Sequence, residues 1–453
     1  MDLQEWKAKQ SQKVISQYTH FDRRISLESC FEYISSPQKV SHHGFYPFIH
    51  HILKSRKVKA EPKKRNIYYA AHMDSWIYRY YAYLINERYN CRVKKDNINM
   101  SSVAYRTDLK MSNVQFARIA FDFIRQAGSC YVMIGDFKDF FDNLNHKHLK
   151  QQLCDLLSVT YLPDDFYAVY KNVTQFAYVE LQDLLHLNGL KDNKKDRKKF
   201  NSHEFERALP IEQFRQHKDI VQHNPKGNRG IPQGSPISAV LANVYMLKTD
   251  KQIQEYVSSF GGFYMRYSDD FIVILPKSEV PFSQQYKTIK GFIKDIDVTL
   301  QEAKTKIFCY ENEKVVNCSS EYTGIEEGGK NIIDFLGFSF NGKQIQIRDR
   351  TVSRYYNKMY RKAKTIVKNR NSDSGNQYIS AKNLYKQYSY KGSRAYLKKM
   401  SRKKGVTFDE EKERGNFLDY VLRAEKEFPR APVNIVAKRH MSKIHKCLNK
   451  PGE

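Results

Sequence analysis

The sequence has no long hydrophobic run. No apolar stretch approaches the roughly 20 residues that a membrane-spanning helix needs, and the start, MDLQEWKAKQSQK, has no hydrophobic signal core. We therefore expect a cytoplasmic protein that does not bind a membrane. Cysteines are few, with seven in 453 residues, and they form no C-x-x-C pair. This scatter predicts free thiols rather than disulfides or structural zinc.

Acidic residues are also scarce. The chain has 49 Asp and Glu against 77 Lys and Arg, a formal net charge of +28. About two thirds of that excess lies after residue 340, where roughly 29 basic residues face 10 acidic ones. A charge run can be only a solvated face, but this concentration favours a surface that binds nucleic acid.

Two pairs of adjacent histidines are further candidate metal ligands besides the cysteines. They are His42–His43 and His50–His51, and no cysteine or acidic cluster accompanies them in the sequence. Packing or a substrate contact is therefore the competing interpretation of these pairs.

The length predicts two or three packed subdomains. Residues 1 to about 55 have the character of helix and loop, and apolar residues recur at helical spacing over 67–89. A second helix is expected over 113–125. The apolar run at 131–134 is typical of a buried strand and places Asp136 at its end.

The remaining segments differ in composition. Residues 175–228 are polar and indicate an insertion with a flexible basic surface. Residues 262–275 have the pattern of a β-hairpin with Asp269 near its tip. After Gly342 the chain is expected to be helical and basic, with a loop at 369–376.

Three carboxylates stand out as candidate catalytic and metal-binding groups: Asp136, Asp269 and Asp270. Carboxylates that converge on one site repel each other unless cations neutralise them. We therefore expect two Mg²⁺ ions, with Mn²⁺ as an alternative. Such a pair activates an attacking hydroxyl and stabilises the leaving group in nucleotidyl transfer.

Five segments occur in an order that resembles the motifs of reverse transcriptases. They are IGDFKDFFDNL (134–144), GIPQGSPISAVLANVYM (230–246), YSDD (267–270), LQEAKTKI (300–307) and FLGF (335–338). The resemblance covers roughly residues 57–340. It implies an α+β, right-hand polymerase fold with fingers, a palm with an antiparallel sheet and a helical basic thumb. It also implies RNA-directed DNA polymerase activity.

This resemblance sets the expected domain boundaries. Residues 1–55 form an N-terminal extension, and 56–130 form the first part of the fingers. The palm spans 131–342 with the fingers insertion near 175–228, and 343–453 form the basic helical thumb or C-terminal domain.

The resemblance also assigns roles around the aspartates. The backbone carbonyl of Phe137 is a further metal ligand, and Phe141 is the aromatic gate that excludes a ribose 2′-hydroxyl. Gln233 and Gly234 contact the incoming nucleotide. Lys304 is placed to neutralise or protonate the departing pyrophosphate.

The resemblance also assigns roles to residues in the fingers and in the primer grip. Arg65 is the candidate clamp for the triphosphate, with Lys63 and Lys64 left open as alternatives, and Arg106 is a candidate contact to template or nucleotide. The remaining assignment is the primer grip, which comprises Leu336 and Gly337.

Several details resemble bacterial defence-associated, unknown-group and abortive-infection reverse transcriptases, which are related to group II intron and retron enzymes. The expected partners are an RNA template, a DNA product, dNTP substrates and a cognate non-coding RNA, with an oligomer or a partner protein left open. Alternatives are a retron or mobile-intron enzyme, a template-independent or protein-primed polymerase, and a silent RNA-binding scaffold. An RNA-directed RNA polymerase is disfavoured by Phe141.

Overall fold

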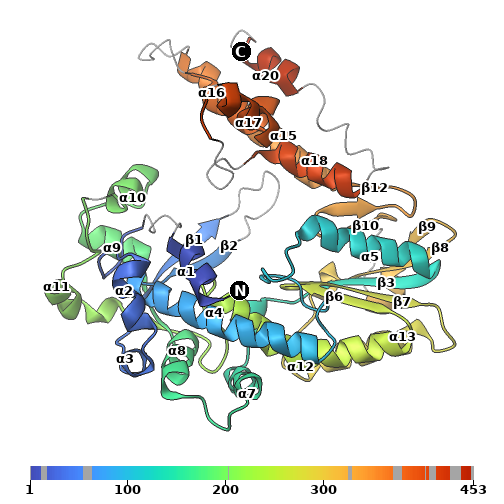
Figure 1. Cartoon of the computed structure of the whole chain (residues 1–453), viewed down its shortest axis with the longest axis horizontal. Helices are drawn as coiled ribbons and strands as arrows, with labels where there is room; N and C mark the ends of the chain where they lie inside the picture. Colours follow the sequence, from blue (N-terminus) through green and yellow to red (C-terminus); the bar gives the residue numbers. More distant parts are fainter. Residues whose placement is uncertain are drawn as a thin grey trace. The chain divides into compact units, whose positions relative to one another are not determined.

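The computed structural model describes residues 2–11, 18–54, 64–202, 204–324, 329–370, 380–403, 405–407, 415–428 and 440–449. In these ranges no helix has the length and apolar character needed to cross a membrane. Helices and strands are mixed along the chain, which confirms the predicted α+β class (Figure 1). The strands form three sheets, in the orders β2-β1-β4-β5, β6-β7-β3-β8-β9 and β10-β11-β12.

The chain divides into two compact units. The first comprises Met1–Lys110, Gly135–Val273 and Ser278–Thr305, and the second comprises Met111–Ile134, Ile274–Lys277 and Lys306–Glu453. The helices of the first unit are α1 (Leu3–Ser11), α2 (Leu27–Ile34), α3 (Pro37–Ser41), α4 (His72–Lys95), α6 (Phe140–Asn143), α7 (His146–Leu157), α8 (Asp164–Thr174), α9 (Leu181–Leu187), α10 (Lys194–Phe200), α11 (Ile211–Gln216), α12 (Ser238–Ser259) and α13 (Phe282–Lys294), with short 3₁₀ turns at Lys218–Ile220 and Glu302–Lys304.

The strands of the first unit are β1 (Phe48–Lys54), β2 (Lys64–Tyr69), β4 (Ala177–Glu180), β5 (Gln222–His223), β6 (Phe263–Tyr267) and most of β7 (Asp270–Pro276). β1 pairs antiparallel with β2 and parallel with β4. Figure 1 shows the long helices α4 and α12 of this unit, which pack against each other.

The beginning of α4 differs from the sequence prediction, which started a helix at Ile67. Residues 64–69 form β2 instead, because they pair with β1. The helix begins at His72, where the Asp22 carboxylate accepts hydrogen bonds from the backbone N–H groups of His72 and Met73 at 2.9 and 2.8 Å. Such a cap satisfies helix donors that have no partner inside the helix. It comes from fifty residues earlier, so local periodicity could not indicate it.

The insertion at 175–228 also differs from the expected flexible surface. It contributes β4 and β5 to the first sheet and folds into α9, α10 and α11. Val179, Leu184 and Phe200 are buried in one apolar cluster with Ile49 of β1. The basic run at 191–199 remains largely exposed, so the sequence indicated the outer face of this segment correctly but not its packed inner face.

A short N-terminal strap, residues 19–24, binds this insertion. The hydroxyl of Thr19 donates to the Phe200 carbonyl at 2.6 Å, and its N–H donates to Asn201 Oδ1 at 2.9 Å. The N–H of Ala208 donates to the His20 carbonyl at 2.7 Å. The strap therefore connects α4, through Asp22, with chain that lies about 180 residues later.

The second unit contains α5 (Asn113–Ala127), α14 (Ser319–Thr323), α15 (Asp349–Arg370), α16 (Lys382–Tyr388), α17 (Arg394–Lys403), α18 (Phe417–Glu427) and α20 (His440–Leu448), with a 3₁₀ turn at Tyr390–Gly392. Its strands are most of β3 (Ser129–Asp136), then β8 (Lys306–Glu311), β9 (Lys314–Asn317), β10 (Ile333–Phe335), β11 (Phe338–Phe340) and β12 (Ile345–Ile347). Both β3–β8 and β8–β9 are antiparallel.

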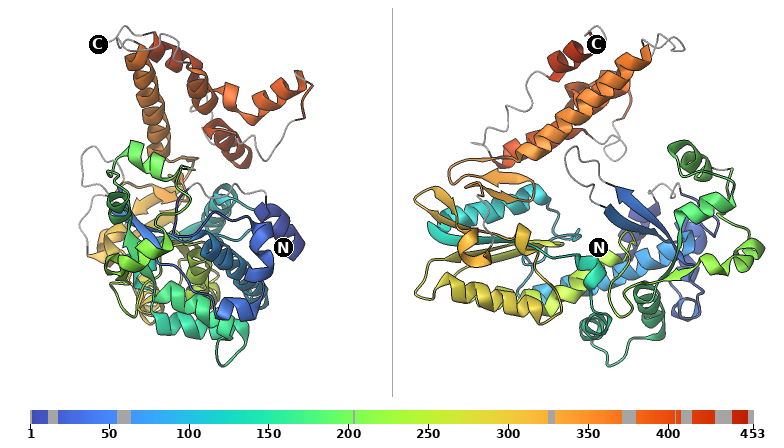
Figure 2. Two further views of the ribbon diagram at one scale, coloured as in Figure 1. Left: turned by 90° about the vertical axis from the view of Figure 1, so that its left-hand side faces the viewer. Right: turned by 180° about the vertical axis from the view of Figure 1, so that it is seen from behind.

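Several expectations for this unit are met. The predicted helix over 113–125 is α5, which a capping box of Ser112 and Gln115 begins, and the predicted strand at 131–134 lies within β3. The chain after Gly342 is mostly helical, and the long helix α15 is visible in both views of Figure 2. Its apolar face packs with α16 and α20 through Met359, Leu384 and Ile444. The predicted loop at 369–376 lies outside the described residues except for its first two, which end α15.

Candidate active site

The site is built on the end of β3, where Asp136 stands. Its backbone carbonyl accepts the Gln301 N–H at 2.8 Å, and the next N–H, of Phe137, donates to the Asp269 carbonyl at 3.3 Å. Gly135 allows this approach, because an added Cβ would lie 2.3 Å from the ring of Phe271. A residue without a side chain is therefore required where β3 passes β7.

The predicted hairpin is formed by β6 and β7, and its turn carries Ser268 and Asp269. Ser268 has φ +63°, a left-handed conformation that is uncommon for a residue with a side chain. The guanidinium of Arg266 donates to the Ser268 carbonyl at 2.9 Å and holds this turn. The buried side chain of Arg266 thereby fixes the conformation of the turn.

Arg266 is itself fixed by Asp250 of α12. The two side chains are fully buried and form a two-pronged ion pair, with N–O distances of 2.6 and 2.9 Å. Tyr264 donates a further hydrogen bond to the Asp250 carboxylate at 2.7 Å. Sequence reasoning missed this support; its signal was a charged residue inside the apolar strand GFYMRY.

The GIPQGSP loop lies against β2. The Tyr68 N–H donates to the Gln233 carbonyl at 2.8 Å. Gly234 has φ +106°, and an added Cβ would lie 2.9 Å from the Tyr68 carbonyl oxygen. Glycine is therefore needed at this position both for its conformation and for the close approach.

The aromatic residue predicted as a sugar gate, Phe141, lies in α6. Its carbonyl accepts the Ile231 N–H at 2.9 Å, which connects this helix to the GIPQGSP loop. The neighbouring Asp142 was missed in the sequence, although it stands inside the motif FFDNL. Burial raises the pKa of the Asp142 carboxyl, while Lys226 and a hydrogen bond from the Gln233 side chain oppose that rise.

The end of β3, α6, the GIPQGSP loop and the turn between β6 and β7 contribute residues to one cavity of about 410 Å³ in the first unit. This volume lies in the range of pockets that bind small molecules. The sequence-predicted residues on its wall are Arg65, Asp136, Phe137, Phe141, Gln233, Gly234, Asp269 and Lys304. Lysine and arginine line the same cavity as the carboxylates, so it offers positive groups for phosphates beside oxygen ligands for cations.

Other predicted residues lie elsewhere. Asp270 is the exposed first residue of β7 and is not among the described residues that line the cavity. Leu336 and Gly337 belong to the second unit and form the turn between β10 and β11 with φ +46° and +93°. The Leu336 carbonyl accepts the Asn113 side-chain N–H at 2.9 Å. Lys63 lies outside the described residues, and Lys64 lines the cavity with Arg65.

Arg106 does not line the cavity and is 4% exposed. Its guanidinium donates to the Asn99 carbonyl at 2.6 Å and to Asp108 Oδ2 at 2.7 Å, so it stabilises its own loop. The preceding residue, Tyr105, lines the cavity instead, and its hydroxyl lies 3.2 Å from Ser268 Oγ. The structure therefore presents the side chain of Tyr105, and not that of Arg106, to the cavity.

The fit to a metal ion depends on Asp136 and Asp269. Carboxylate and carbonyl oxygens are the ligands that Mg²⁺ prefers. Lys304 makes an ion pair with Asp136 and so neutralises that carboxylate in this conformation. Within the described ranges, no three His, Cys, Asp or Glu side chains are grouped closely enough to hold one ion. The donor chemistry fits Mg²⁺, and an ion at Asp136 would compete with the Lys304 ammonium.

The histidine pairs take part in protein contacts. His43 Nε2 lies 2.8 Å from Asp74 Oδ1, and His50 Nδ1 lies 2.7 Å from Glu180 Oε1. His43 and His50 thus each contact one carboxylate of the protein, as the packing interpretation of these histidines predicts.

Comparison with known proteins gives matches of two kinds. Residues 191–340 match the family model described as reverse transcriptase (RNA-dependent DNA polymerase). The retron Mx162 reverse transcriptase of Myxococcus xanthus is 37% identical over 59 residues, which are 13% of this chain and 12% of that protein. The match thus spans about an eighth of the curated relative's length.

Solved structures show distant likenesses. The apo telomerase of Candida tropicalis, truncated from its C-terminal domain, has a TM-score of 0.38 and 13% identity, over 72% of this chain and 61% of that one. The RNA-dependent RNA polymerase of a human picobirnavirus has a TM-score of 0.34 and 10% identity, over 60% and 43% of the two chains.

The family match begins inside the insertion and ends with β11, so it includes the GIPQGSP loop, the YSDD turn, Lys304 and the FLGF turn. Asp136 and Phe141 lie outside it, yet line the same cavity as Gln233, Asp269 and Lys304. Over residues 191–340, the family match confirms the resemblance to reverse transcriptases that the ordered motifs predicted, and a shorter stretch of the chain is similar to the bacterial retron enzyme.

Proposed function

We propose that the protein is an RNA-directed DNA polymerase that extends a primer by nucleotidyl transfer. The observation that carries this proposal is the single cavity shared by Asp136, Asp269 and Lys304. Its size suits a nucleoside triphosphate, and its wall combines acidic with basic side chains. A protein that only bound RNA would have no use for carboxylates at such a place, because they repel phosphate.

We assign Asp136 and Asp269 to the metal ions, with the Phe137 carbonyl and Asp270 as further ligands. Two Mg²⁺ ions, or Mn²⁺ in their place, would lower the pKa of the attacking 3′-hydroxyl and neutralise charge on the phosphates when bound. Asp270 does not line the cavity, so its assignment is supported by the sequence resemblance alone. The ligand set is therefore a proposal in which each carboxylate can be removed separately.

The chain's own residues would position the nucleotide. Arg65 and Lys64, on the exposed end of β2, are placed to bind the triphosphate. Gln233 and the Gly234 backbone would contact the sugar and phosphates, while the Phe141 ring would exclude a 2′-hydroxyl. Lys304 would exchange its Asp136 partner for the developing charge of pyrophosphate.

We further propose the assignment of domains that the motifs suggest. Residues 1–55 would extend the N-terminus, and 56–130 with the insertion near 175–228 would form the fingers. The palm would occupy 131–342 and carry the primer grip at Leu336–Gly337, and 343–453 would form the basic thumb.

The biological role that we propose is cDNA synthesis in the bacterial cytoplasm on a structured non-coding RNA, in defence against phage. The basic C-terminal region supports an RNA partner, because phosphate contacts dominate such affinity. The match to a retron enzyme favours a second candidate, in which the template is the RNA of a retron.

A polymerase assay tests the central proposal. The purified full chain, poly(rA) with an oligo(dT) primer, dTTP and Mg²⁺ should give extended DNA, and Asp269→Ala should lower the rate at least about a hundredfold. Asp219→Ala is the matched control, because Asp219 is exposed and does not line the cavity. Equal activity of Asp269→Ala and the control would reject the assignment of the active site.

The template is tested by sequencing. RNA bound to the protein purified from cells that express it with its genomic neighbourhood would be sequenced together with the new DNA. DNA complementary to one bound RNA supports the templated proposal. DNA without a matching RNA would support the template-independent or protein-primed alternative instead.

A further inference from the structure

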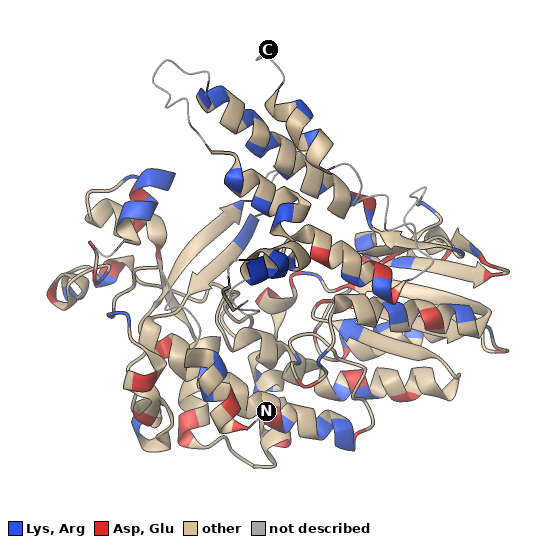
Figure 3. Ribbon diagram, turned by 45° about the horizontal axis from the view of Figure 1, so that its top comes forward, with Lys and Arg blue, Asp and Glu red and all other residues tan. Residues whose placement is uncertain are grey.

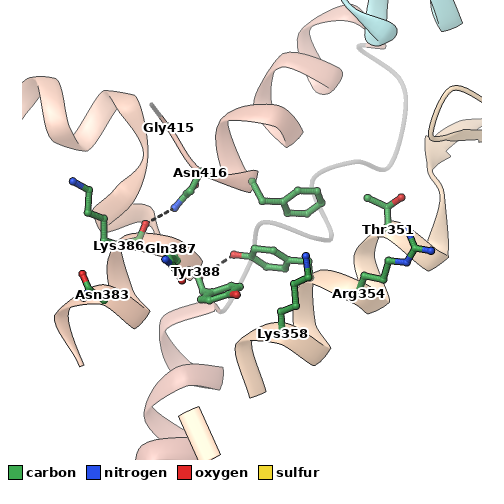
Figure 4. Close-up of a pocket in the computed structure, with 11 residues that line it drawn as sticks. Thr351, Arg354, Lys358, Asn383, Lys386, Gln387, Tyr388, Gly415 and Asn416 are labelled. Atoms are coloured by element: carbon green, nitrogen blue, oxygen red, sulfur yellow. Dashed lines mark hydrogen bonds between the residues drawn. The ribbon is translucent and has the colours of Figure 1, made fainter. Parts of the chain in front are cut away.

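The second unit contains a cavity that the proposed polymerase reaction does not use. Its volume is about 590 Å³. Figure 4 shows the side chains around it, which come from α15, from α16 and from the start of α18. All of them lie between residues 351 and 417, so the cavity is separate from the one that holds Asp136 and Asp269.

One wall is a continuous face of α15. Its side chains are Thr351, Arg354, Tyr355 and Lys358. Residues separated by three, four and seven positions lie on one side of a helix, so these four side chains form a single stripe. Arg354 and Lys358 are exposed, while Tyr355 is 7% exposed and forms the floor.

The opposite wall is a face of α16. Asn383, Lys386 and Gln387 line the cavity with the same helical spacing, and Tyr388 ends the helix. Basic residues also run along the helices near the C-terminus (Figure 3). The only acid in α15 is Asp349, at its beginning, and α16 has none.

The walls are held together by specific hydrogen bonds. The Tyr355 hydroxyl donates to the Tyr388 carbonyl at 3.0 Å. The Asn416 side-chain N–H₂ donates to the Ser389 carbonyl at 2.7 Å and to the Lys386 carbonyl at 3.2 Å, while its oxygen caps α18. The cavity is therefore formed by residues whose positions are fixed without a ligand, as is usual for binding pockets.

The charged side chains among the described lining residues are all basic. Arg354, Lys358 and Lys386 line the cavity, and no acidic residue is among the described residues that do. This differs from the first cavity, where carboxylates stand beside lysine. A site with cations alone suits an anion that arrives without a metal ion, and guanidinium with ammonium suits phosphate.

Phosphate alone would leave most of this volume empty. The remaining wall offers the half-buried rings of Tyr388 and Phe417 and the amides of Asn383 and Gln387. Aromatic rings stack on nucleobases, and amide groups hydrogen-bond their edges. The lining thus supplies groups for each part of a nucleotide.

We infer that this cavity binds a nucleoside phosphate, with the phosphate on Arg354, Lys358 and Lys386 and the base beside Tyr388 and Phe417. The ligand is either an unpaired nucleotide of a bound RNA strand or a free nucleotide, which share this chemistry. The inference adds a second site to the proposed polymerase and takes from that proposal only the expectation of nucleic acid as partner.

Binding measurements test it with the full chain. The probes are a fluorescein-labelled 20-nucleotide single-stranded RNA, and separately AMP and ATP without Mg²⁺. The pocket variant is Arg354→Ala/Lys358→Ala, and the matched control is Lys364→Ala/Lys368→Ala, which removes two exposed charges from α15 outside the cavity. Thermal unfolding of each variant checks that the fold is retained.

We expect the pocket variant to bind the RNA about tenfold more weakly than the control and to lower the salt slope of log K by about 1.4, as for two lost phosphate contacts on a single strand. A 4-thiouridine RNA should cross-link to Tyr388 or Phe417. If AMP or ATP binds and this binding is lost in the pocket variant alone, the ligand is the free nucleotide.

Equal loss of binding in the two double variants, for RNA and for free nucleotides alike, would overturn the inference. Primer extension on poly(rA) is measured in parallel with the same preparations. If the unmodified chain shows no primer extension, the polymerase proposal is contradicted. The second site is then still decided by the binding measurements alone.

Discussion

At the scale of single residues, Phe141 is the side chain whose proposed role has the clearest readout. Replacement by alanine removes the ring from the wall of the 410 Å³ cavity. We expect the ratio of ribonucleotide to deoxynucleotide incorporation to rise by about tenfold or more, because the steric barrier to a 2′-hydroxyl is lost. Steady-state kinetics with dTTP and UTP on poly(rA) measures this ratio.

Phe141→Tyr is the conservative control, since it keeps a flat ring and should keep the discrimination. If alanine and tyrosine at this position gave the same nucleotide preference as the original residue, Phe141 would be only a packing residue.

His20 in the strap makes stability depend on pH. Burial lowers the pKa of His20 to about 4, against an opposing effect of Asp22 and with a further lowering by His72. Its Nδ1 accepts the Phe21 N–H at 2.9 Å, and its Nε2 lies 3.1 Å from the Tyr69 carbonyl, so the neutral ring satisfies both contacts. Protonation of Nδ1 would place its N–H against the N–H of Phe21, and that hydrogen bond would be lost.

The sign of the effect follows from the lowered pKa. The stabilisation is fully present above pH 6.5, where His20 is neutral in both folded and unfolded chains, and is lost as the pH falls toward 4. Thermal unfolding between pH 7 and pH 4.5 should show a smaller decrease for His20→Gln than for the unmodified chain. His186→Gln, at an exposed position, should change nothing, and parallel curves for all three would refute the role of His20.

At the scale of elements, the β6–β7 hairpin depends on a helix. Asp250 of α12 pairs with the fully buried Arg266, which in turn binds the Ser268 carbonyl of the turn. Asp250→Asn would leave a buried guanidinium without its counter-ion. We expect a loss of about 3 to 5 kcal/mol in the free energy of unfolding, measured with urea.

Tyr264→Phe removes one hydrogen bond from the same carboxylate and is expected to cost about 1 kcal/mol. A loss for Asp250→Asn no larger than this would mean that the ion pair does not hold the hairpin.

The same elements show what sequence can reveal. The hairpin, α5 and β3 were predicted because each has a local signal: two apolar strands around a polar centre, apolar residues at helical spacing, or a continuous apolar run. The start of α4 was not predicted correctly. Its cap comes from Asp22, and the residues predicted to begin it form β2 because they pair with β1. Long-range partners override local periodicity in both cases.

The candidate site divides in the same way. Seven residues assigned within the ordered motifs line one cavity, together with Arg65 from outside them. Arg106 was predicted as a contact, whereas Tyr105 lines the cavity; the sequence does not reveal the left-handed backbone at Tyr105, with φ +63°. The sequence did not predict the cavity between α15, α16 and the start of α18. Its residues belong to no motif and come together only when these three helices pack.

At the scale of the whole molecule, the dominant property is charge. A net charge of +28 predicts that binding of single-stranded RNA weakens steeply with salt. If six to ten phosphates of a single strand are contacted, the affinity should fall by roughly 300-fold to roughly 10⁴-fold between 50 and 200 mM salt. Fluorescence anisotropy at several salt concentrations measures this slope, and a flat profile would show that phosphates contribute little.

The strap has a consequence for the order of events during synthesis. Residues 19–24 bind partners at 200–208, so they emerge from the ribosome long before those partners exist. At about 5 to 20 residues per second, the N-terminal segment waits roughly 10 to 40 seconds. During that interval the insertion's docking site for it is absent. Docking of the strap is therefore timed by translation of the insertion, and a pause there would prolong the exposure of its aromatic residues to chaperones and proteases.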